Sequence, residues 1–152
     1  MKLLLLFTGL VLAAALSLRA VDTTKVNTSK APTMNLVSGL YNWEKMTATP
    51  TSNGLRRAVF DGATPTVDKL HCHITTLNPG ERSSEPHRHL QDEVIIVKEG
   101  TIEANWDGNL STGGPGSVIF FAAGATTALR NVGQTPATYI VVNYSTPLTP
   151  KS

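Results

Sequence analysis

The sequence contains a single cysteine, Cys72, among its 152 residues. With one thiol no disulfide can form within the chain, so a hydrophobic core must provide the stability of the fold. A chain of about 130 residues after the N-terminal segment described below can form such a core and has no room for a second domain. We expect Cys72 to be buried in that core.

An excess of charge of either sign is also missing. The chain has 13 basic and 11 acidic residues, and two of the basic ones, Lys2 and Arg19, lie in the first 20 residues. Without that segment, 11 basic residues balance 11 acidic residues. Nucleic-acid-binding domains usually carry a basic surface, and so do proteins held on anionic membranes. We therefore expect neither a nucleic-acid partner nor a membrane-surface role.

Long hydrophobic runs are absent except at the N-terminus. Lys2 precedes an apolar run over residues 3–18, and Ala20 then offers a small residue for cleavage. This order is typical of a secretory signal peptide. The run is shorter than the about 20 apolar residues of a spanning helix, so no stable membrane anchor is expected. We predict that the signal peptide, residues 1–20, is removed and that the protein is secreted or periplasmic.

No stretch after residue 20 shows a sustained helical pattern of apolar residues. Turn signals such as Asp107-Gly108 recur at short intervals, and between them lie short runs rich in Val, Ile, Phe, Thr and Tyr. Strands are expected at residues 70–77, 93–98, 101–106, 117–121 and 138–144. Many short strands with regular turns predict an all-β sandwich or barrel. We expect a flexible lead-in at 21–36, one barrel domain at 37–146 and a tail at 147–152.

The candidate site residues are two histidines and a carboxylate in the sequence Pro86-His87-Arg88-His89-Leu90-Gln91-Asp92-Glu93. In an extended chain alternate residues face the same side. His87, His89 and Glu93 then line one face, together with Ile95 and Val97. Two His and one carboxylate can hold Fe(II), Mn, Ni or Zn and leave positions open for a ligand. The alternative is a pair of surface histidines beside an acidic turn.

Over about residues 70–144 the sequence resembles the cupin superfamily, whose members form small double-stranded β-helix (jelly-roll) barrels. The first cupin motif reads here as Gly80, six residues, His87-Arg88-His89, three residues, Glu93, six residues and Gly100. The resemblance implies a jelly-roll barrel. It also implies that His87, His89 and Glu93 correspond to three of the family's four metal ligands.

The second cupin motif is matched less completely. Gly116, Gly124 and Asn131 fall in register, whereas Ala122 stands where Pro is usual. Thr127 stands where the resemblance places the last metal-binding His. A neutral hydroxyl is a poor ligand beside imidazole and carboxylate. A water could complete the three-ligand site.

A second His-x-His pair, His71 and His73, lies on the preceding expected strand. Its parity is opposite to that of Leu70, Cys72 and Ile74. Because the apolar set should face the core, we expect both histidines to face solvent or a partner chain. A metal role for either of them is the less favoured interpretation.

The resemblance does not fix a reaction, because cupin folds support many functions. The leading interpretation is an exported cupin that binds a divalent metal and a small-molecule ligand in its barrel, and an oxygenase or isomerase is one form of it. The alternative is a non-catalytic, metal-free protein that binds a small molecule such as a sugar. The resemblance also implies a homodimer, since cupins commonly pair through their sheets.

Overall fold

The computed structural model of the chain describes residues 36–150. The predicted signal peptide and nearly all of the predicted lead-in therefore lie outside the described residues. Within the described part the only helix is a single short turn, η1 (Trp43–Lys45), and no helix there is long and apolar enough to cross a membrane.

Ten β-strands make up most of the described chain. They are β1 (Thr49–Thr51), β2 (Gly54–Gly62), β3 (Lys69–Leu77), β4 (His87–Arg88), β5 (Glu93–Glu99), β6 (Ile102–Trp106), β7 (Asn109–Gly113), β8 (Val118–Phe121), β9 (Thr126–Asn131) and β10 (Ala137–Ser145). The all-β prediction is confirmed. The five strands named from the sequence appear with bounds that differ by one residue at most, and β1, β2, β4, β7 and β9 were not among those named.

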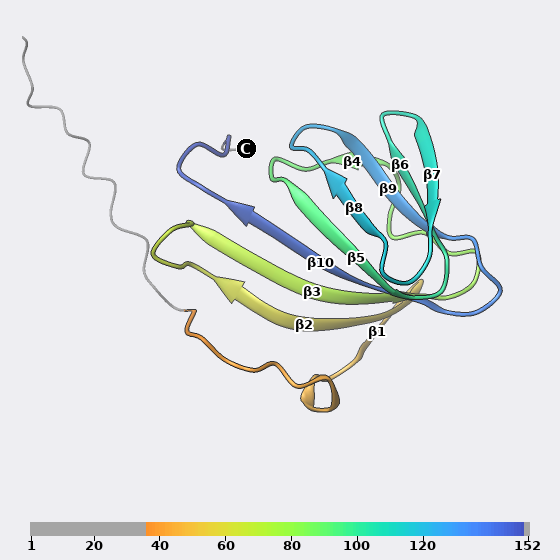
Figure 1. Ribbon diagram of the computed structural model, residues 1–152, viewed down its shortest axis with the longest axis horizontal. Helices are drawn as coiled ribbons and strands as arrows, with labels where there is room; N and C mark the ends of the chain where they lie inside the picture. Colours follow the sequence, from red (N-terminus) through yellow and green to blue (C-terminus); the bar gives the residue numbers. More distant parts are fainter. Residues whose placement is uncertain (1–35, 151–152) are drawn as a thin grey trace, which may run out of the picture. The chain divides into compact units, whose positions relative to one another are not determined.

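The strands form two antiparallel sheets that face each other (Figure 1). The larger sheet has the order β1-β2-β3-β10-β5-β8, and the smaller has the order β4-β9-β6-β7. Sequence neighbours such as β5 and β6 lie in different sheets, so the chain crosses repeatedly between the two layers. This arrangement is the jelly roll that the sequence predicts.

Two of the predicted turns show why their residues are needed. Asp107 and Gly108 both have positive φ, 50° and 86°, and form the two-residue loop between the paired Trp106 and Asn109. Asp-Gly is a favoured sequence for such hairpin loops. Gly100 joins β5 to β6 with φ 78°, and a Cβ there would lie 2.6 Å from the Cα of Ala137. Both the backbone conformation and the close packing therefore require glycine.

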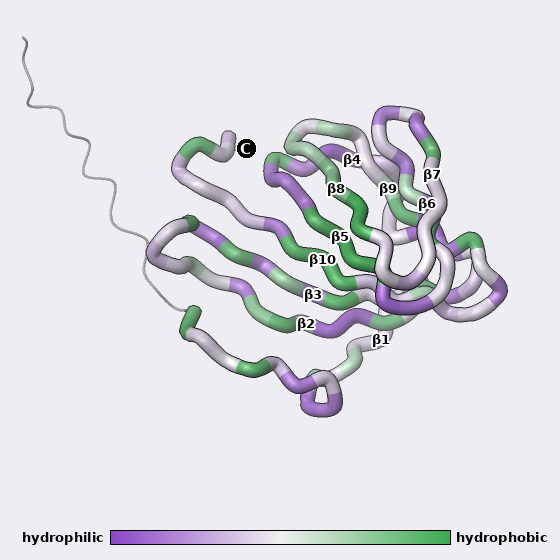
Figure 2. The backbone as a smooth tube through the Cα atoms, viewed as in Figure 1, coloured by the Kyte–Doolittle hydropathy of each residue, from purple (hydrophilic) through white to green (hydrophobic). Residues whose placement is uncertain are grey.

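The core lies between the sheets. It consists of Leu77, Ile95, Val97, Ile102, Ala104, Phe121, Leu129, Ala137, Tyr139 and Val141. Figure 2 shows the hydrophobic character concentrated in β5, β8 and β10, while the middle of β2 is hydrophilic. The interior of the barrel is thus mainly apolar where β5, β8 and β10 contribute, and it contains polar side chains where β2 and β3 contribute.

The outer face of the larger sheet is also partly covered. Trp43 lies 4.6 Å from the cationic groups of both Arg57 on β2 and Lys98 on β5, so it reaches across the strands between them. On the face of β3 opposite the cavity, Cys72 and Ile74 are 5% and 4% exposed. The predicted burial of Cys72 is confirmed, and desolvation raises the pKa of its thiol.

Candidate metal and ligand site

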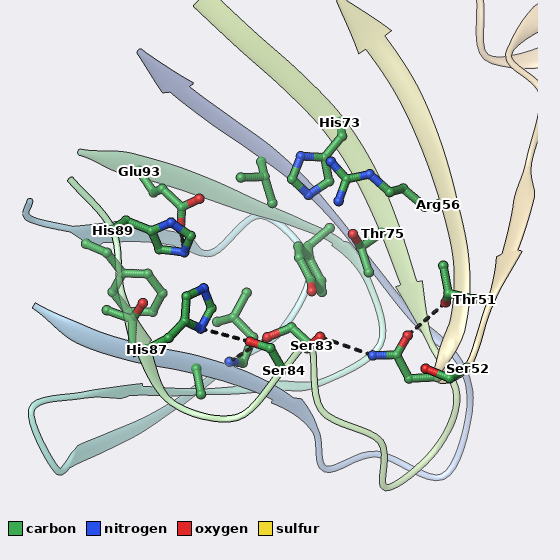
Figure 3. A pocket seen from close by; sticks show the side chains of 17 residues that line it. Thr51, Ser52, Arg56, His73, Thr75, Ser83, Ser84, His87, His89 and Glu93 are labelled. Atoms are coloured by element: carbon green, nitrogen blue, oxygen red, sulfur yellow. Dashed lines mark hydrogen bonds and ion pairs between the residues drawn. The ribbon is translucent and has the colours of Figure 1, made fainter. Parts of the chain in front are cut away.

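A cavity of about 400 Å³ opens between the two sheets. The strands β2, β3, β5 and β10 supply one side of it, and β9 with the segment leading into β4 supplies the other (Figure 3). Phe121, Leu129 and Val141 give it an apolar part, but most of the residues that line it have polar side chains. The cavity therefore suits a small ligand with several polar groups.

His87, His89 and Glu93 all line this cavity and gather on one side of it (Figure 3). The two imidazole rings have centroids 4.4 Å apart, and Nε2 of His89 lies 3.8 Å from Oε2 of Glu93. Only His87 belongs to β4, since the chain leaves the extended conformation before it enters β5 at Glu93. The three side chains nevertheless share the cavity, as the parity argument predicted.

Neighbouring groups orient two of these side chains, His87 and Glu93. Nδ1 of His87 lies 2.9 Å from the carbonyl oxygen of Glu85 and 3.0 Å from Oγ of Ser84. Donation of the Nδ1 proton to that carbonyl leaves the Nε2 lone pair of His87 available, which is the usual arrangement of a metal-binding histidine. Glu93 is 8% exposed, and its Oε1 accepts a hydrogen bond of 3.2 Å from Asn143.

These donors fit a divalent ion in chemical type, but they do not form a finished metal centre. Across residues 36–150 no three His, Cys, Asp or Glu side chains lie close enough together to hold one ion. Two of the three expected ligands, His89 and Glu93, lie close to each other, and the ring of His87 lies next to that of His89. The site is thus a set of three suitable ligands from both sheets that gather at one end of the cavity, and their ligation of a metal stays a prediction.

Thr127 stands beside these ligands. It pairs with His87 across the β4–β9 ladder, is 3% exposed and lines the cavity. Gly124, three residues earlier, has φ 83° and donates its N–H to the carbonyl of His89 at 2.8 Å. The second-motif segment therefore packs against the first, and a hydroxyl occupies the place next to His87.

The expected orientation of His73 is wrong. His73 and Thr75 line the cavity, whereas Cys72 and Ile74 lie on the opposite, outer face of the sheet. The alternation along β3 was predicted correctly, but its apolar face was assigned to the wrong side. The reason is that this sheet is covered on both faces, and its inner face lines a polar cavity here. Apolar residues then no longer identify the inside of the barrel.

His71 and His73 belong to a polar row along the inner face of β2 and β3. Nε2 of His71 lies 3.0 Å from Nδ1 of His73 and 3.4 Å from a guanidinium nitrogen of Arg56. Nδ1 of His71 lies 3.4 Å from the carboxylate of Asp61, which also pairs with Lys69. The row is therefore charged at both ends, and its Arg56 end opens into the cavity.

Burial and nearby charge determine which groups of the cavity are ionised. Desolvation, with the charges of Arg56 and His71, lowers the pKa of His73 to about 4. His73 is consequently neutral at pH 7. Desolvation also raises the pKa of Tyr139 to about 12, and the charge of Glu93 acts in the same direction. Tyr139 thus remains a protonated hydroxyl that can donate a hydrogen bond.

Sequence reasoning did not identify Arg56 or Tyr139 as residues of the cavity. Arg56 lies on β2, a strand that the sequence did not indicate, because two adjacent arginines interrupt any apolar alternation there. Tyr139 is 2% exposed and lines the cavity, whereas Tyr144 is 40% exposed and its hydroxyl lies 3.4 Å from Asp92. Pairing of β10 with β3 and β5 is what turns Tyr139 inward, and the sequence alone does not give that register.

Comparisons with known proteins agree with this architecture. A family model described as Cupin domain matches residues 73–143. A search of the curated proteins finds no match.

Three solved structures show the similarity of fold. An RmlC-like cupin from Shewanella frigidimarina has 17% identity and a TM-score of 0.61, over 76% of this chain and 97% of that one. The polyketide cyclase RemF from Streptomyces resistomycificus has 18% identity and a TM-score of 0.58, over 71% and 80%. A predicted oxalate decarboxylase from Thermotoga maritima has 17% identity and a TM-score of 0.59, over 70% and 99%.

Proposed function

Because the chain belongs to the cupin superfamily, we propose that it binds a divalent metal ion through His87, His89 and Glu93, beside a small polar ligand held in the same cavity. The observation that supports this most directly is the approach of His89 Nε2 to Glu93 Oε2, 3.8 Å, with the ring of His87 next to them. Fe, Mn, Ni and Zn all accept imidazole and carboxylate ligands.

The surrounding residues support the ligands in this role. The carbonyl of Glu85 and the hydroxyl of Ser84 hold His87 by its Nδ1, and the amide of Asn143 holds Glu93. Such contacts fix the direction of a ligand's lone pair. A bound ion would supply Lewis acidity and orient an oxygen atom of the ligand. An oxygenase or isomerase reaction is the enzymatic form of this proposal.

Metal titration tests the proposal. Protein treated with EDTA and dialysed is titrated with Mn²⁺ and with Zn²⁺ by calorimetry, as wild type, His87→Ala and His71→Ala. We expect one ion per chain in the wild type and a loss of affinity of about tenfold or more in His87→Ala. His71→Ala removes an imidazole that is not part of the cavity lining and should bind as the wild type does. Equal affinities in the wild type and His87→Ala would contradict the proposal.

A metal-free binding protein is the second candidate. Thr127 beside His87 favours it, since a hydroxyl occupies the place next to the proposed ligands. The hydroxyl and amide groups of Thr51, Ser52, Asn53 and Ser83 also line the cavity and could bind a sugar's hydroxyl groups. Under this alternative neither ion binds stoichiometrically, and the His87→Ala variant titrates like the wild type.

A further inference from the structure

Arg56 and Arg57 are adjacent in the sequence but lie on opposite faces of β2. Arg56 lines the cavity, whereas Arg57 lies over the ring of Trp43 on the outer face. Figure 3 shows Arg56 next to His73, away from the side of the cavity where His87, His89 and Glu93 gather. The cavity therefore has a cation at a distance from the proposed metal ligands.

Arg56 has no carboxylate partner among the described residues. In residues 36–150 three cations pair with carboxylates, Lys69 with Asp61, Arg82 with Glu85, and Lys98 with Glu99, whereas Arg56, like Lys45, Arg57, Arg88 and Arg130, does not. The polar contact of Arg56 is Nε2 of His71 at 3.4 Å, which is long for a hydrogen bond. Arg56 is exposed, so solvent, and not an ion pair within the part of the chain that the structure describes, surrounds its charge, and the guanidinium is open to a ligand that enters the cavity.

The groups around Arg56 add hydrogen-bond donors without adding negative charge. Thr75 is its cross-strand partner on β3, and Tyr139 pairs with Thr75 in turn, so all three face the cavity. Tyr139 stays protonated at neutral pH, and His73 beside Arg56 stays neutral. Glu93, the carboxylate of the cavity, is already held by Asn143 and lies near His89. This end of the cavity is therefore suited to an anion.

We infer that Arg56 binds a carboxylate group of the ligand, so that the natural ligand is a small organic acid. The inference deepens the proposed function, because it concerns the same cavity, but it does not require the metal. A guanidinium presents two parallel N–H groups that match the two oxygens of a carboxylate. One arginine, with neither a glycine-rich loop nor a helix N-terminus beside it in the described chain, fits a singly charged carboxylate better than a doubly charged phosphate.

The size of the cavity is consistent with this ligand class. At about 400 Å³ it can hold a small organic molecule. A carboxylate at Arg56 directs the remainder of such a molecule toward His87, His89 and Glu93 across the cavity (Figure 3). A second polar group at the far end of the ligand would then lie near the proposed metal ligands.

Titration of metal-free protein with simple acids tests the inference. ¹⁵N-labelled protein in EDTA is titrated with acetate, succinate and glutarate, with the matched neutral amides, and with inorganic phosphate at constant ionic strength. The variants are Arg56→Gln, Arg56→Lys and, as a matched control on the other face of the same strand, Arg57→Gln. Amide spectra and thermal unfolding establish that each variant is folded.

We expect the acids, and not the amides, to shift amide signals of β2 and β3. Arg56→Gln should weaken that binding about tenfold, which is in the range of a charged hydrogen bond. Arg56→Lys should retain part of the affinity, and Arg57→Gln all of it. Absence of acid binding in the wild type, or equal binding in Arg56→Gln, would overturn the inference. Tighter binding of phosphate would overturn the carboxylate assignment.

The result can be separated from that of the metal titration. Acid binding that depends on Arg56, in a protein that takes up no Mn²⁺ or Zn²⁺, would support the inference and contradict the proposed metal site. Metal uptake without acid binding would support the proposed metal site and contradict the inference about Arg56. The two failures therefore give different patterns in the same set of proteins.

Discussion

Thr127 is the residue at which this cavity departs from the four-ligand site that the resemblance to cupins implies. Its hydroxyl lies in the cavity directly across the strand ladder from His87. If the geometry around Thr127 suits a ligand, Thr127→His should tighten the binding of Mn²⁺ or Zn²⁺, because imidazole is a much better donor than a neutral hydroxyl. Calorimetric titration of wild type and variant measures the change.

Thr127 is buried, and the larger His side chain has a cost. Overpacking of this kind destabilises a fold by about 1–3 kcal/mol, so thermal unfolding of Thr127→His must be measured alongside. Thr127→Val, which has nearly the same shape and no hydroxyl, is the matched control and should bind metal no better than the wild type. A folded Thr127→His protein that binds no more tightly would show that position 127 is not a ligand position.

At the scale of the strands, the spacing of residues predicted which side chains share a face but not always which face it is. For β5 both predictions are correct, since Glu93, Ile95 and Val97 share one face, and that face points inward and is nearly fully buried. For β3 only the shared face was predicted correctly, since His73 points inward and Ile74 is buried on the outer face. The outer cover comes from the segment that contains Trp43, and nothing in the alternation of β3 indicates it.

The site residues that lie close together in the sequence could be predicted, whereas those on distant strands could not. His87, His89 and Glu93 lie within seven positions of one another, so one motif contains them all. Arg56 and Tyr139 reach the same cavity from β2 and β10, through the register of each with β3. That register depends on long-range pairing and not on local pattern, which is why these two residues were not recognised from the sequence.

Asn131 shows how the end of one strand is fixed to others. It is fully buried, and its Nδ2 donates to the carbonyls of Leu77 at 3.0 Å and Thr135 at 2.9 Å, while its Oδ1 accepts from Gly133 N at 2.9 Å. Asn131→Ala removes the partner of all three backbone groups, and the Leu77 carbonyl among them is buried. We expect the free energy of unfolding, measured by urea denaturation, to fall by about 2–4 kcal/mol.

Asn109→Ala is the control for that variant. Asn109 is exposed, and its side chain donates one hydrogen bond of 3.1 Å to the carbonyl of Trp106. We expect a loss of about 1 kcal/mol or less. Similar losses in the two variants would mean that the buried contacts of Asn131 do not stabilise the connection of β9 to β3 and β10.

At the scale of the whole molecule, the compartment decides which metals and ligands the cavity meets, and it depends on residues outside the described part. We propose that the chain is exported and that its mature form begins near Val21. Lys2, the apolar run over residues 3–18 and the small residue Ala20 support this proposal. Mass spectrometry of the exported protein should find an N-terminus near Val21, and the mature chain should remain soluble.

A substitution that adds one positive charge tests whether the apolar run acts as a signal peptide. Leu12→Arg places a cation in the middle of the apolar run and should leave the precursor intact inside the cell, because export requires an uninterrupted apolar segment. Thr28→Arg adds the same charge beyond the expected cleavage point and should be exported and processed as the wild type is. Recovery of intact Met1 in the membrane fraction would contradict cleavage. Equal processing of both variants would show that the apolar run does not direct export.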